Sequence, residues 1–494
     1  MLLDQETLKY IFGMKMRGLR LDKGLSLKAL SEKTGMSPSY LNEIEKGKKY
    51  PKSDKIMILA KALGESYEDM ISVKLKRELS LVSQLLEKNI LTGVPFDLFG
   101  IPAQVVYELL SERPRKMGAL IGTLLELARA HNISIDEFYY ATLRAYLDLH
   151  QNFFPSLEEK VEVCRRDKGL DVTRGPAEVA VQLRAILKKD YNIEVVRSDF
   201  TQVSTSLENL FYYLKSNGKD STLYLHQGLG SREEALILAR ELGYVYLKLN
   251  ERPMSSIIQS LDSFQQLLNH FSASYFASGL LIPEREFVTG LKKLFKAKAF
   301  DGPAMKEWAL SYASPVESVF HRMTQLLPRE LGIDHLFFLR LDYEAMENRF
   351  QVVRELHLAE RHNPHKISGN EHYCRRWLTT RLLEKMQAGG GDDFSLGCQK
   401  SHFRGSDTDY LAWSMAFKKD VPNGDLAAIT VGVLINKKVE ETISYLSDPN
   451  IPAKETAESC ERCELTDCAE RAAPFNPKMD PLRPEKIRQA LSQI

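Results

Sequence analysis

Apolar side chains recur every three or four residues through the first 70 positions, and single glycines interrupt the pattern. The first run starts near Leu8 and continues to Gly24, and shorter runs follow it. This spacing is typical of amphipathic helices, and a glycine directly after a run is a common helix stop. The pattern predicts five short helices between residues 5 and 70, which would form an all-α N-terminal domain.

Two serines mark where the second and third of these helices begin. Ser26 precedes the run from Leu27, and Ser37 precedes Pro38, a residue that suits the first position of a helix. A serine at such a position caps free backbone N–H groups. Gly35 stands between the two helices and permits a tight turn. The segment therefore predicts a helix-turn-helix.

The pattern changes several times along the rest of the chain. Residues 78–200 look all-helical, with a break at 152–155. Strand-like runs join helices in residues 190–300, and further strand-like runs occur in residues 315–440. The tail from Ser447 is rich in proline, cysteine and charge, and it looks irregular. The clearest strand-like runs are 193–196, 222–225, 336–341 and 426–435.

Length and composition describe a soluble chain of several domains. A chain of 494 residues is too long for one hydrophobic core, so we expect about two to four domains. Hydrophobic content of 44% and charged content of 27% are ordinary for soluble proteins. The sequence has no long apolar run, and its start lacks a signal-peptide pattern. We therefore expect a cytoplasmic protein without a membrane partner.

Positive charge gathers at the N-terminal end. The whole chain has a formal net charge of +1, whereas residues 1–77 hold 16 Lys and Arg against 10 Asp and Glu. Such a local excess is typical of a module that binds phosphate groups. A solvated helical surface explains the charge equally well, so the motif has to decide between the two interpretations.

The third predicted helix carries polar side chains on the flank opposite Leu41 and Ile44. Side chains with donors and acceptors on such a helix can read base edges in the major groove, and nearby cations can meet phosphates. The predicted base-reading residues are Ser37, Ser39, Tyr40, Asn42 and Glu43. The predicted phosphate contacts are Arg17, Arg20, Lys46, Lys48 and Lys49. Together they predict double-stranded DNA as the partner.

Three pieces of this region carry a family resemblance: residues 25–30, 34–37 and 41–47, the last followed by Pro51. They resemble the lambda-repressor-like, XRE-type helix-turn-helix family. The resemblance implies that the third helix is the recognition helix. It also implies a homodimer on a two-fold-related DNA site, because one small module rarely buries enough surface alone.

Residues 231–247 form a predicted amphipathic helix that carries Glu241. A zinc peptidase helix would place two histidines around such a glutamate, and here Arg240 and Tyr244 hold those positions. This helix and the later segment 273–283 resemble the ImmA/IrrE metallopeptidase-like family. The resemblance implies the fold of that family without its metal ligands, so we expect a degenerate domain that is not an enzyme.

The six cysteines are too few for a disulfide framework in a chain of this length. Cys460, Cys463 and Cys468 lie close together in sequence and form half of a zinc site. Cys374, His372 or a more distant cysteine would complete it. The alternatives are a set of reduced structural thiols or a redox-responsive set.

The cysteine segment 460–468, with Arg471 and Pro474, and the upstream segment 374–377 carry a further resemblance. They resemble the C-terminal domain of the short-chain fatty acyl transcriptional regulators. Members of that family join an XRE-type helix-turn-helix, a metallopeptidase-like middle and this C-terminal domain in this order. The resemblance implies control by a short-chain acyl-CoA or a related carboxylic metabolite.

Together these observations predict a multidomain, ligand-responsive transcription regulator. The fold expected is an all-α helix-turn-helix domain, a helical linker, and α+β middle and C-terminal domains. The alternatives are a phage-type repressor or antitoxin controlled by a protein partner, and a zinc peptidase targeted to DNA. The predicted divisions are 1–75 (DNA-binding), 76–185 (linker), 186–310 (degenerate metallopeptidase-like) and 311–494 (acyl-CoA-sensing, with the cysteine-rich tail).

Overall fold

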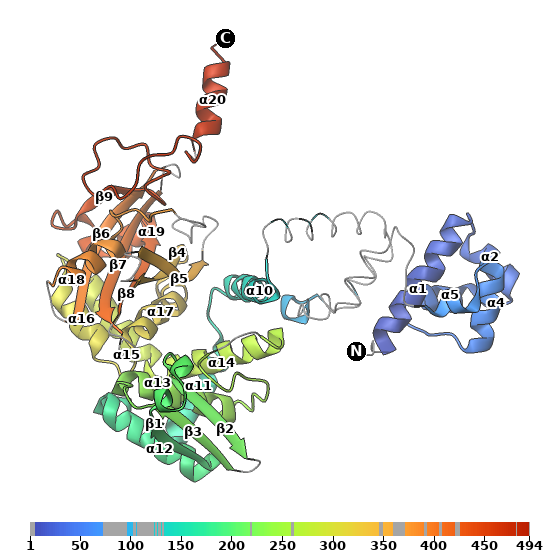
Figure 1. Ribbon diagram of the computed structural model, residues 1–494, viewed down its shortest axis with the longest axis horizontal. Helices are drawn as coiled ribbons and strands as arrows, with labels where there is room; N and C mark the ends of the chain where they lie inside the picture. Colours follow the sequence, from blue (N-terminus) through green and yellow to red (C-terminus); the bar gives the residue numbers. More distant parts are fainter. Residues whose placement is uncertain are drawn as a thin grey trace. The chain divides into compact units, whose positions relative to one another are not determined.

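The protein is described by a computed structural model (Figure 1). It describes residues 5–72, 96–101, 133–217, 220–257, 261–344, 349–358, 371–389, 393–404, 408–419, 425–480 and 482–493, with isolated positions between 105 and 130. The chain divides into two compact units. The first comprises Met1–Tyr146 with Asp262–Phe264, and the second comprises Leu147–Leu261 with Gln265–Ile494.

The N-terminal part of the first unit contains five helices, as the hydrophobic pattern predicts. They are α1 (Gln5–Asp22), α2 (Leu27–Thr34), α3 (Pro38–Glu45), α4 (Ser53–Leu63) and α5 (Tyr67–Ile71). The two predicted caps are confirmed: Ser26 Oγ accepts from Ala29 N at 3.0 Å, and Ser37 Oγ accepts from Tyr40 N at 3.2 Å. Gly35 takes the left-handed conformation at φ 70° that the turn requires.

The helices of this unit enclose one apolar core. Met16 of α1, Leu30 of α2, Leu41 of α3 and Leu63 of α4 are fully buried in it. Each such side chain contributes roughly 1.5–3 kcal/mol through burial. Helix α1 approaches α3 closely at Gly13, where an added Cβ would lie 2.3 Å from a carbonyl oxygen of α3. The core and this contact fix which flank of α3 faces outward.

Helix α10 (Ile135–Leu149) and a short 3-10 helix (Phe96–Phe99) follow in the chain. Residues 73–95 and most of 102–132 lie outside the described residues, and with them much of the first half of the predicted linker. None of the described helices is long and apolar enough to span a membrane.

A small three-stranded sheet opens the second unit, in the order β1-β3-β2. Strands β1 and β3 are parallel, whereas β2 and β3 are antiparallel. Helix α12 packs on β1 and α13, and the predicted division at 185/186 falls within this helix. The elements are α11 (Pro155–Lys168), α12 (Pro176–Tyr191), β1 (Ile193–Ser198), β2 (Tyr212–Asn217), β3 (Asp220–His226), α13 (Ser231–Tyr246) and α14 (Phe264–Leu281).

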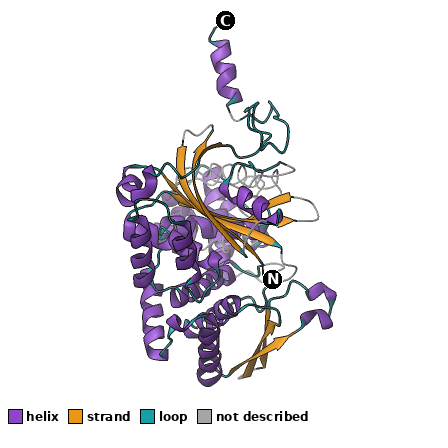
Figure 2. Ribbon diagram, turned by 90° about the vertical axis from the view of Figure 1, so that its left-hand side faces the viewer, coloured by secondary structure: helices purple, strands orange, loops and turns teal. Residues whose placement is uncertain are grey.

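A six-stranded sheet follows, in the order β5-β4-β8-β7-β6-β9 (Figure 2). All neighbours are antiparallel except β6 and β9, which are parallel. Its strands are β4 (Leu336–Glu344), β5 (Arg349–Leu358), β6 (Phe394–Phe403), β7 (Thr408–Lys418), β8 (Leu426–Leu434) and β9 (Ala453–Thr456). Its helices are α15 (Glu284–Phe295), α16 (Gly302–Leu310), α17 (Val316–Leu326), α18 (Leu378–Gln387), α19 (Lys437–Thr442) and α20 (Arg483–Leu491). Strand β9 and α20 lie in the tail that looked irregular from sequence.

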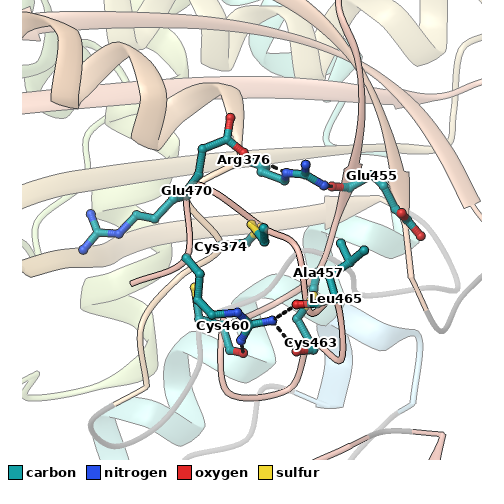
Figure 3. A pocket seen from close by; sticks show the side chains of 11 residues that line it. Cys374, Arg376, Glu455, Ala457, Cys460, Cys463, Leu465 and Glu470 are labelled. Carbon is teal, nitrogen blue, oxygen red and sulfur yellow. Dashed lines mark hydrogen bonds and ion pairs between the residues drawn. The ribbon is translucent and has the colours of Figure 1, made fainter. Parts of the chain in front are cut away.

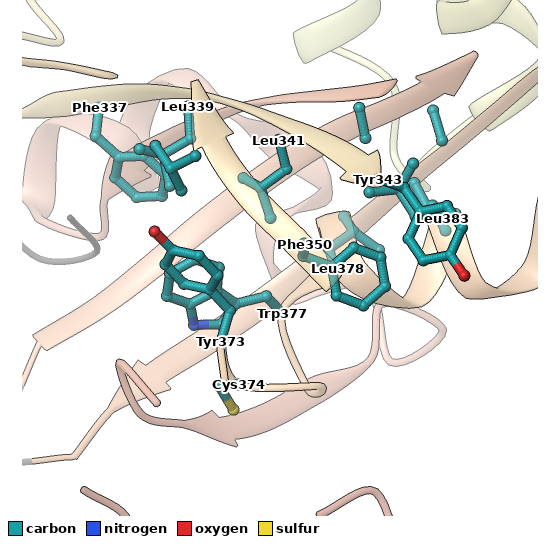
Figure 4. Close-up of a cluster of buried hydrophobic side chains, with 14 of the residues drawn as sticks. Phe337, Leu339, Leu341, Tyr343, Phe350, Tyr373, Cys374, Trp377, Leu378 and Leu383 are labelled. Atoms are coloured by element: carbon teal, nitrogen blue, oxygen red, sulfur yellow. The ribbon is translucent and has the colours of Figure 1, made fainter. Parts of the chain in front are cut away.

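Helices cover both faces of this sheet. Alternate residues of β4, such as Phe337 and Leu339, join the cluster beneath α18 (Figure 4). The intervening Phe338 meets His321 of α17 on the other face, with ring centroids 5.4 Å apart. The two sheets and their helices confirm a multidomain, mixed α and β architecture.

A buried polar joint connects the start of α11 with α14 and α17. The guanidinium of Arg322 donates to both carboxylate oxygens of Glu158, at 2.6 and 2.8 Å. The hydroxyl of Tyr275 donates to the same carboxylate at 2.6 Å. One segment earlier, Asn152 Nδ2 donates to Thr324 Oγ1 at 2.9 Å. The chain break predicted at 152–155 is therefore a fixed corner of the second unit.

Burial alone would raise the pKa of Glu158, but the hydrogen bonds and charge of Arg322 outweigh it and lower the pKa. A carboxyl whose pKa is lower in the folded state than in the unfolded state stabilises the fold at pH values above its unfolded-state pKa. This stabilisation is lost as the pH falls through the folded-state pKa. We expect Arg322→Met to reduce the free energy of unfolding by about 3–5 kcal/mol, because Glu158 would be left as a buried charge. Urea unfolding of the full chain at pH 7 measures the loss of stability in Arg322→Met. The same measurement at pH 4 shows how much of the stabilisation by Glu158 is lost as the pH falls.

Two further variants control this prediction. The double variant Glu158→Leu with Arg322→Met should regain most of the lost stability, because no buried charge remains. Lys188→Ala removes only an exposed ion pair with Glu194 and should change stability by less than about 0.5 kcal/mol. A double variant as unstable as Arg322→Met would contradict this account of the joint.

Candidate functional site

Helix α3 presents a polar flank to solvent. Its apolar residues Leu41 and Ile44 are fully buried, which turns the opposite side of the helix outward. Four of the five predicted base-reading residues are accessible here: Ser37 and Ser39 are exposed, and Asn42 and Glu43 are partly exposed. Tyr40, contrary to the prediction that it points away from the core, packs its partly buried side chain against the core of the domain. The short helix thus offers hydroxyl, amide and carboxylate groups along one accessible edge.

Lysines extend this flank beyond the end of α3. Lys48 and Lys49 are exposed, and Lys46 is partly exposed. Lys49 Nζ lies 2.9 Å from the carboxylate of Glu43, and the hydrogen bond that Lys49 donates to this carboxylate raises the pKa of Lys49. Exposed pairs of this kind are weak, so a phosphate group can replace the carboxylate. Arg17 of α1 is partly exposed, although its Nε is buried and has no hydrogen-bond partner among the described residues.

Arg20 does not face solvent, contrary to the prediction that it contacts phosphate. It is 7% exposed, and its guanidinium binds both carboxylate oxygens of Glu45 at 2.6 and 2.8 Å. A third nitrogen donates to the carbonyl of Leu25 at 2.7 Å. Arg20 therefore ties α1 to α3 and to the loop before α2, and its hydrogen-bonding groups are already in use.

The sequence contains a signal for this ion pair. Arg20 follows Met16 by four residues, which places it on the buried stripe of α1. Glu45 directly follows Ile44 at the end of α3, and it is 3% exposed. Opposite charges on two buried stripes indicate a buried pair, because an unpaired buried charge is rare.

The region that resembles a metallopeptidase contains an ion pair between Glu241 and Arg252. Glu241 of α13 is 5% exposed and accepts from Arg252 at 2.8 Å. The guanidinium of Arg252 also lies over the ring of Tyr244, 4.8 Å from its centroid. The hydroxyl of Tyr244 forms a hydrogen bond of 2.7 Å with Nδ1 of His270 on α14. Arg240 lies over the ring of Tyr212, 5.0 Å away.

Burial governs the titration of these groups. It raises the pKa of Glu241, although Arg252 opposes the shift, and it lowers the pKa of His270 to about 3. His270 is therefore a neutral imidazole at pH 7, and Arg252 supplies the positive charge beside Glu241. These polar groups are partners of one another, and the carboxylate of Glu241 is held by Arg252.

The four cysteines of the predicted metal site line one small pocket: Cys374, Cys460, Cys463 and Cys468 (Figure 3). Backbone hydrogen bonds bring the two distant segments together. Cys460 N donates to the carbonyl of His372 at 2.9 Å, and Cys374 N donates to the carbonyl of Glu458 at 3.2 Å. His372 itself points its imidazole to Glu461, 2.8 Å away, and does not line the pocket.

Arg471 holds the loop that carries three of these cysteines, a role that sequence reasoning missed. Its guanidinium donates to the carbonyls of Cys460 at 2.9 Å and Cys463 at 2.8 Å. It also donates to the carbonyls of Leu465 and Ala473. One planar cation thus binds four carbonyl groups of an otherwise irregular loop.

The chemistry of this pocket suits a soft metal. Burial raises the pKa of the Cys374 thiol to about 11, which favours the protonated form, so a bound cation would be needed to hold a thiolate there. Four thiolates are the ligands of structural zinc and of iron–sulfur clusters. In the part of the chain that the structure describes, no three His, Cys, Asp or Glu side chains are arranged to hold one ion. A cluster of several irons bridges thiolates that stand further apart.

Comparison with known proteins supports the helix-turn-helix interpretation of the N-terminal helices. Residues 16–70 match the helix-turn-helix family model HTH_3. A Mycobacterium tuberculosis transcriptional regulator of known structure is similar, with a TM-score of 0.47 and 17% sequence identity over 68% of this chain and 94% of that chain. No curated protein matches the chain. The N-terminal domain is therefore a helix-turn-helix domain, and α2 and α3 are its two defining helices.

The two arginines of α1 should behave differently when they are replaced. Arg20→Met leaves Glu45 buried without its partner, so we expect a loss of about 3 kcal/mol in the free energy of unfolding of this domain. Arg17→Gln should change stability by less than about 0.5 kcal/mol and weaken binding to duplex DNA. Thermal unfolding followed by circular dichroism, together with fluorescence anisotropy on labelled duplex, separates the two effects.

The double variant Arg20→Met with Glu45→Leu is the matched control. It should recover much of the lost stability, because it removes both charges. If Arg20→Met kept full stability and lost DNA affinity instead, Arg20 would be a phosphate contact after all.

Proposed function

We propose that this protein is a ligand-responsive transcription regulator that binds double-stranded DNA as a homodimer through α3. The observation that carries the proposal is the capped, outward-facing α3 within the helix-turn-helix domain of residues 16–70. Helices of this motif enter the major groove with their N-terminal residues against base edges. Ser37, Ser39 and Asn42 are the side chains best placed for that contact.

The two kinds of contact have different consequences. Lys48, Lys49 and Arg17 would neutralise phosphates and give affinity for any duplex. Asn42 and Ser39 would contact base edges and select among sequences. A homodimer follows from the size of the domain, because one such module buries too little DNA surface for a tight complex. Its two half-sites would lie about 34–36 Å apart, one turn of DNA.

The effector is proposed to be a short-chain acyl-CoA or a related carboxylic metabolite. Its support is the resemblance of the segments around Cys374 and Cys460 to the short-chain fatty acyl regulators. The large second unit, with its own sheet and core, is also more than a bare repressor needs. The proposal that the middle domain has a metallopeptidase-like fold likewise rests on the resemblance of residues 231–247 and 273–283 to that family.

A metal at the cysteine pocket completes the proposal. The four thiols would ligate an iron–sulfur cluster, or a single zinc ion once their side chains draw closer together, and either group would crosslink the segment around Cys374 to the tail. Arg471 and the paired backbone around His372 would hold the loop in the same place with either group.

Replacing the lysines after α3 should weaken DNA binding without changing its sequence preference. We expect Lys48→Gln with Lys49→Gln to reduce affinity on all duplexes and to lower the slope of log K against log salt by about 1–2. Asn42→Ala should leave that slope unchanged and reduce the preference for the selected site by roughly 1–3 kcal/mol. Anisotropy titrations between low and moderate salt measure both quantities, after the site has been selected from a random DNA pool.

Lys55→Gln, on the first turn of α4, serves as the matched surface control for the lysine variants. An unchanged salt slope in the double lysine variant would show that these residues do not meet the duplex. Failure of the intact chain to bind any duplex at low salt would exclude the proposed function itself.

The metal content of the purified protein tests the cysteine pocket. We expect one zinc per chain by elemental analysis, or iron and sulfide with visible absorption if the occupant is an iron–sulfur cluster. Cys463→Ser should abolish either signal and lower the thermal stability of the second unit. Cys398→Ser, which alters a buried cysteine outside the pocket, should retain the metal. Protein prepared without oxygen that carries neither metal would overturn the metal assignment.

A further inference from the structure

A cluster of lysines at the end of α15 is positively charged within an otherwise acidic part of the chain. Residues 287–300 contain four lysines and no acidic residue, which gives this stretch a formal charge of +4. Residues 78–494 as a whole have a net charge of −5, since the entire chain has +1 and residues 1–77 have +6. The four residues, which we call the α15 lysine surface, are Lys292, Lys293, Lys296 and Lys298.

The packing of α15 directs this surface to solvent. Phe287, Leu291 and Phe295 are buried on the other side of the helix. Phe295 stacks on the ring of Trp413 of β7, with ring centroids 5.3 Å apart. All four lysines are exposed. Because its apolar side is anchored on the six-stranded sheet, the helix presents the lysines at a fixed place on this unit.

The lysines of this surface form no ion pair or side-chain hydrogen bond with any residue that the structure describes. Lys292 and Lys296 are one helical turn apart, so their charges repel each other. The dipole of the helix accounts for the lysines in its last turn, but not for Lys298 in the loop that follows. The surface therefore lacks the counter-charge that would stabilise it.

The two carboxylates beside this loop are already in use. Asp301 caps α16, and its carboxylate accepts the backbone N–H of Ala304 at 2.9 Å. Asp448 accepts the backbone N–H of Phe300 at 2.9 Å. Both acids serve the backbone of the loop and leave the lysines to an anion from outside the chain.

The composition of the surface favours one class of anionic partner. Membrane surfaces are bound by cations together with exposed apolar side chains, and no large apolar side chain is exposed in the described stretch 261–344. Protein interfaces have an apolar centre and are depleted in lysine. The phosphate backbone of duplex DNA needs neither, because charge alone binds it. Lysine contacts phosphate as a point charge, without the fixed geometry of arginine.

We propose that the α15 lysine surface binds the phosphate backbone of duplex DNA that flanks the site read by α3. The inference rests on the proposed function, because α3 brings the duplex to the chain. A second contact on the same molecule then forms at the high effective concentration that linked sites share. This contact adds affinity and a longer footprint, and it carries no sequence preference.

Two duplexes of different length test the proposal with the full chain. The short duplex holds only the selected site, and the long duplex extends it on each side by about two turns, roughly 20 base pairs. We expect the parent chain to bind the long duplex about threefold or more tightly than the short one. Lys292→Gln with Lys296→Gln should remove most of this gain and lower the slope of log K against log salt on the long duplex by about 1–2. Affinity for the short duplex should stay within about twofold of the parent, because these lysines meet only flanking phosphates.

Lys188→Gln with Lys189→Gln is the charge-matched control, since it removes two exposed lysines from α12 of the same unit. It should keep the gain from flanking DNA and the salt slope of the parent. Thermal unfolding of both variants should match that of the parent, because all the altered side chains are exposed. Equal affinity of the parent for the two duplexes, or a control that loses as much as the α15 variant, would overturn the assignment.

Co-sedimentation with vesicles of phosphatidylserine and phosphatidylcholine tests a membrane as the partner instead. We expect no binding of the parent chain to these vesicles at moderate salt. Vesicle binding that the α15 variant abolishes, without any effect of flanking DNA, would assign the surface to a membrane.

Sequence selection on the short duplex keeps the two proposals separate. A chain that selects a short site but gains nothing from flanking DNA loses only the α15 lysine surface. A chain whose affinity for long duplexes depends on these lysines, but which selects no sequence, keeps the surface and loses the regulatory function.

Discussion

The ion pair between Arg20 and Glu45 sets the position of α3 in the first unit. It is buried and bidentate, and it holds the middle of the DNA-binding domain together at the point where α1 crosses α3. Because Gly13 has no Cβ, α1 can approach α3 so closely that an added Cβ would lie 2.3 Å from the carbonyl oxygen of Ile44. Because Leu41 and Ile44 point into the core, the polar flank of α3 faces solvent. Every DNA contact that we propose for α3 depends on this orientation.

The helices of the first unit could be predicted because their signals are local. A serine cap, a glycine in the left-handed region and an apolar stripe act within a few residues of each other. The phosphate contact predicted for Arg20 is wrong because the prediction followed from its charge alone. Its spacing from Met16 places Arg20 on the buried stripe of α1, where it pairs with Glu45. Periodicity is the better guide to the direction of a helical side chain, since it reflects geometry directly.

The second unit could be predicted only in part, for two physical reasons. Strand β7 is buried on both faces, so its sequence lacks the alternation that marks a half-buried strand. Strand β8 is buried in the same way, but its continuous apolar run marked it in the sequence. The cysteine pocket depends on pairing between residues 372–374 and 458–460, which are far apart in sequence. Sequence spacing indicated Cys460, Cys463 and Cys468, but it left Cys374 and His372 as equal candidates. Only the fold shows which of the two lines the pocket.

Strand β9 ties the cysteine pocket to the edge of the six-stranded sheet. It pairs with β6, and its Glu455 lines the pocket. Lys454 of β9 shares the carboxylate of Glu470 with Arg376, and Arg376 binds that carboxylate more closely, at 2.7 Å against 3.4 Å. Glu470 belongs to the tail, whereas Arg376 lies just before α18, so one carboxylate connects three segments that are distant in sequence. The tail is therefore held against the sheet by side-chain ion pairs as well as by the backbone pairing of residues 372–374 with 458–460.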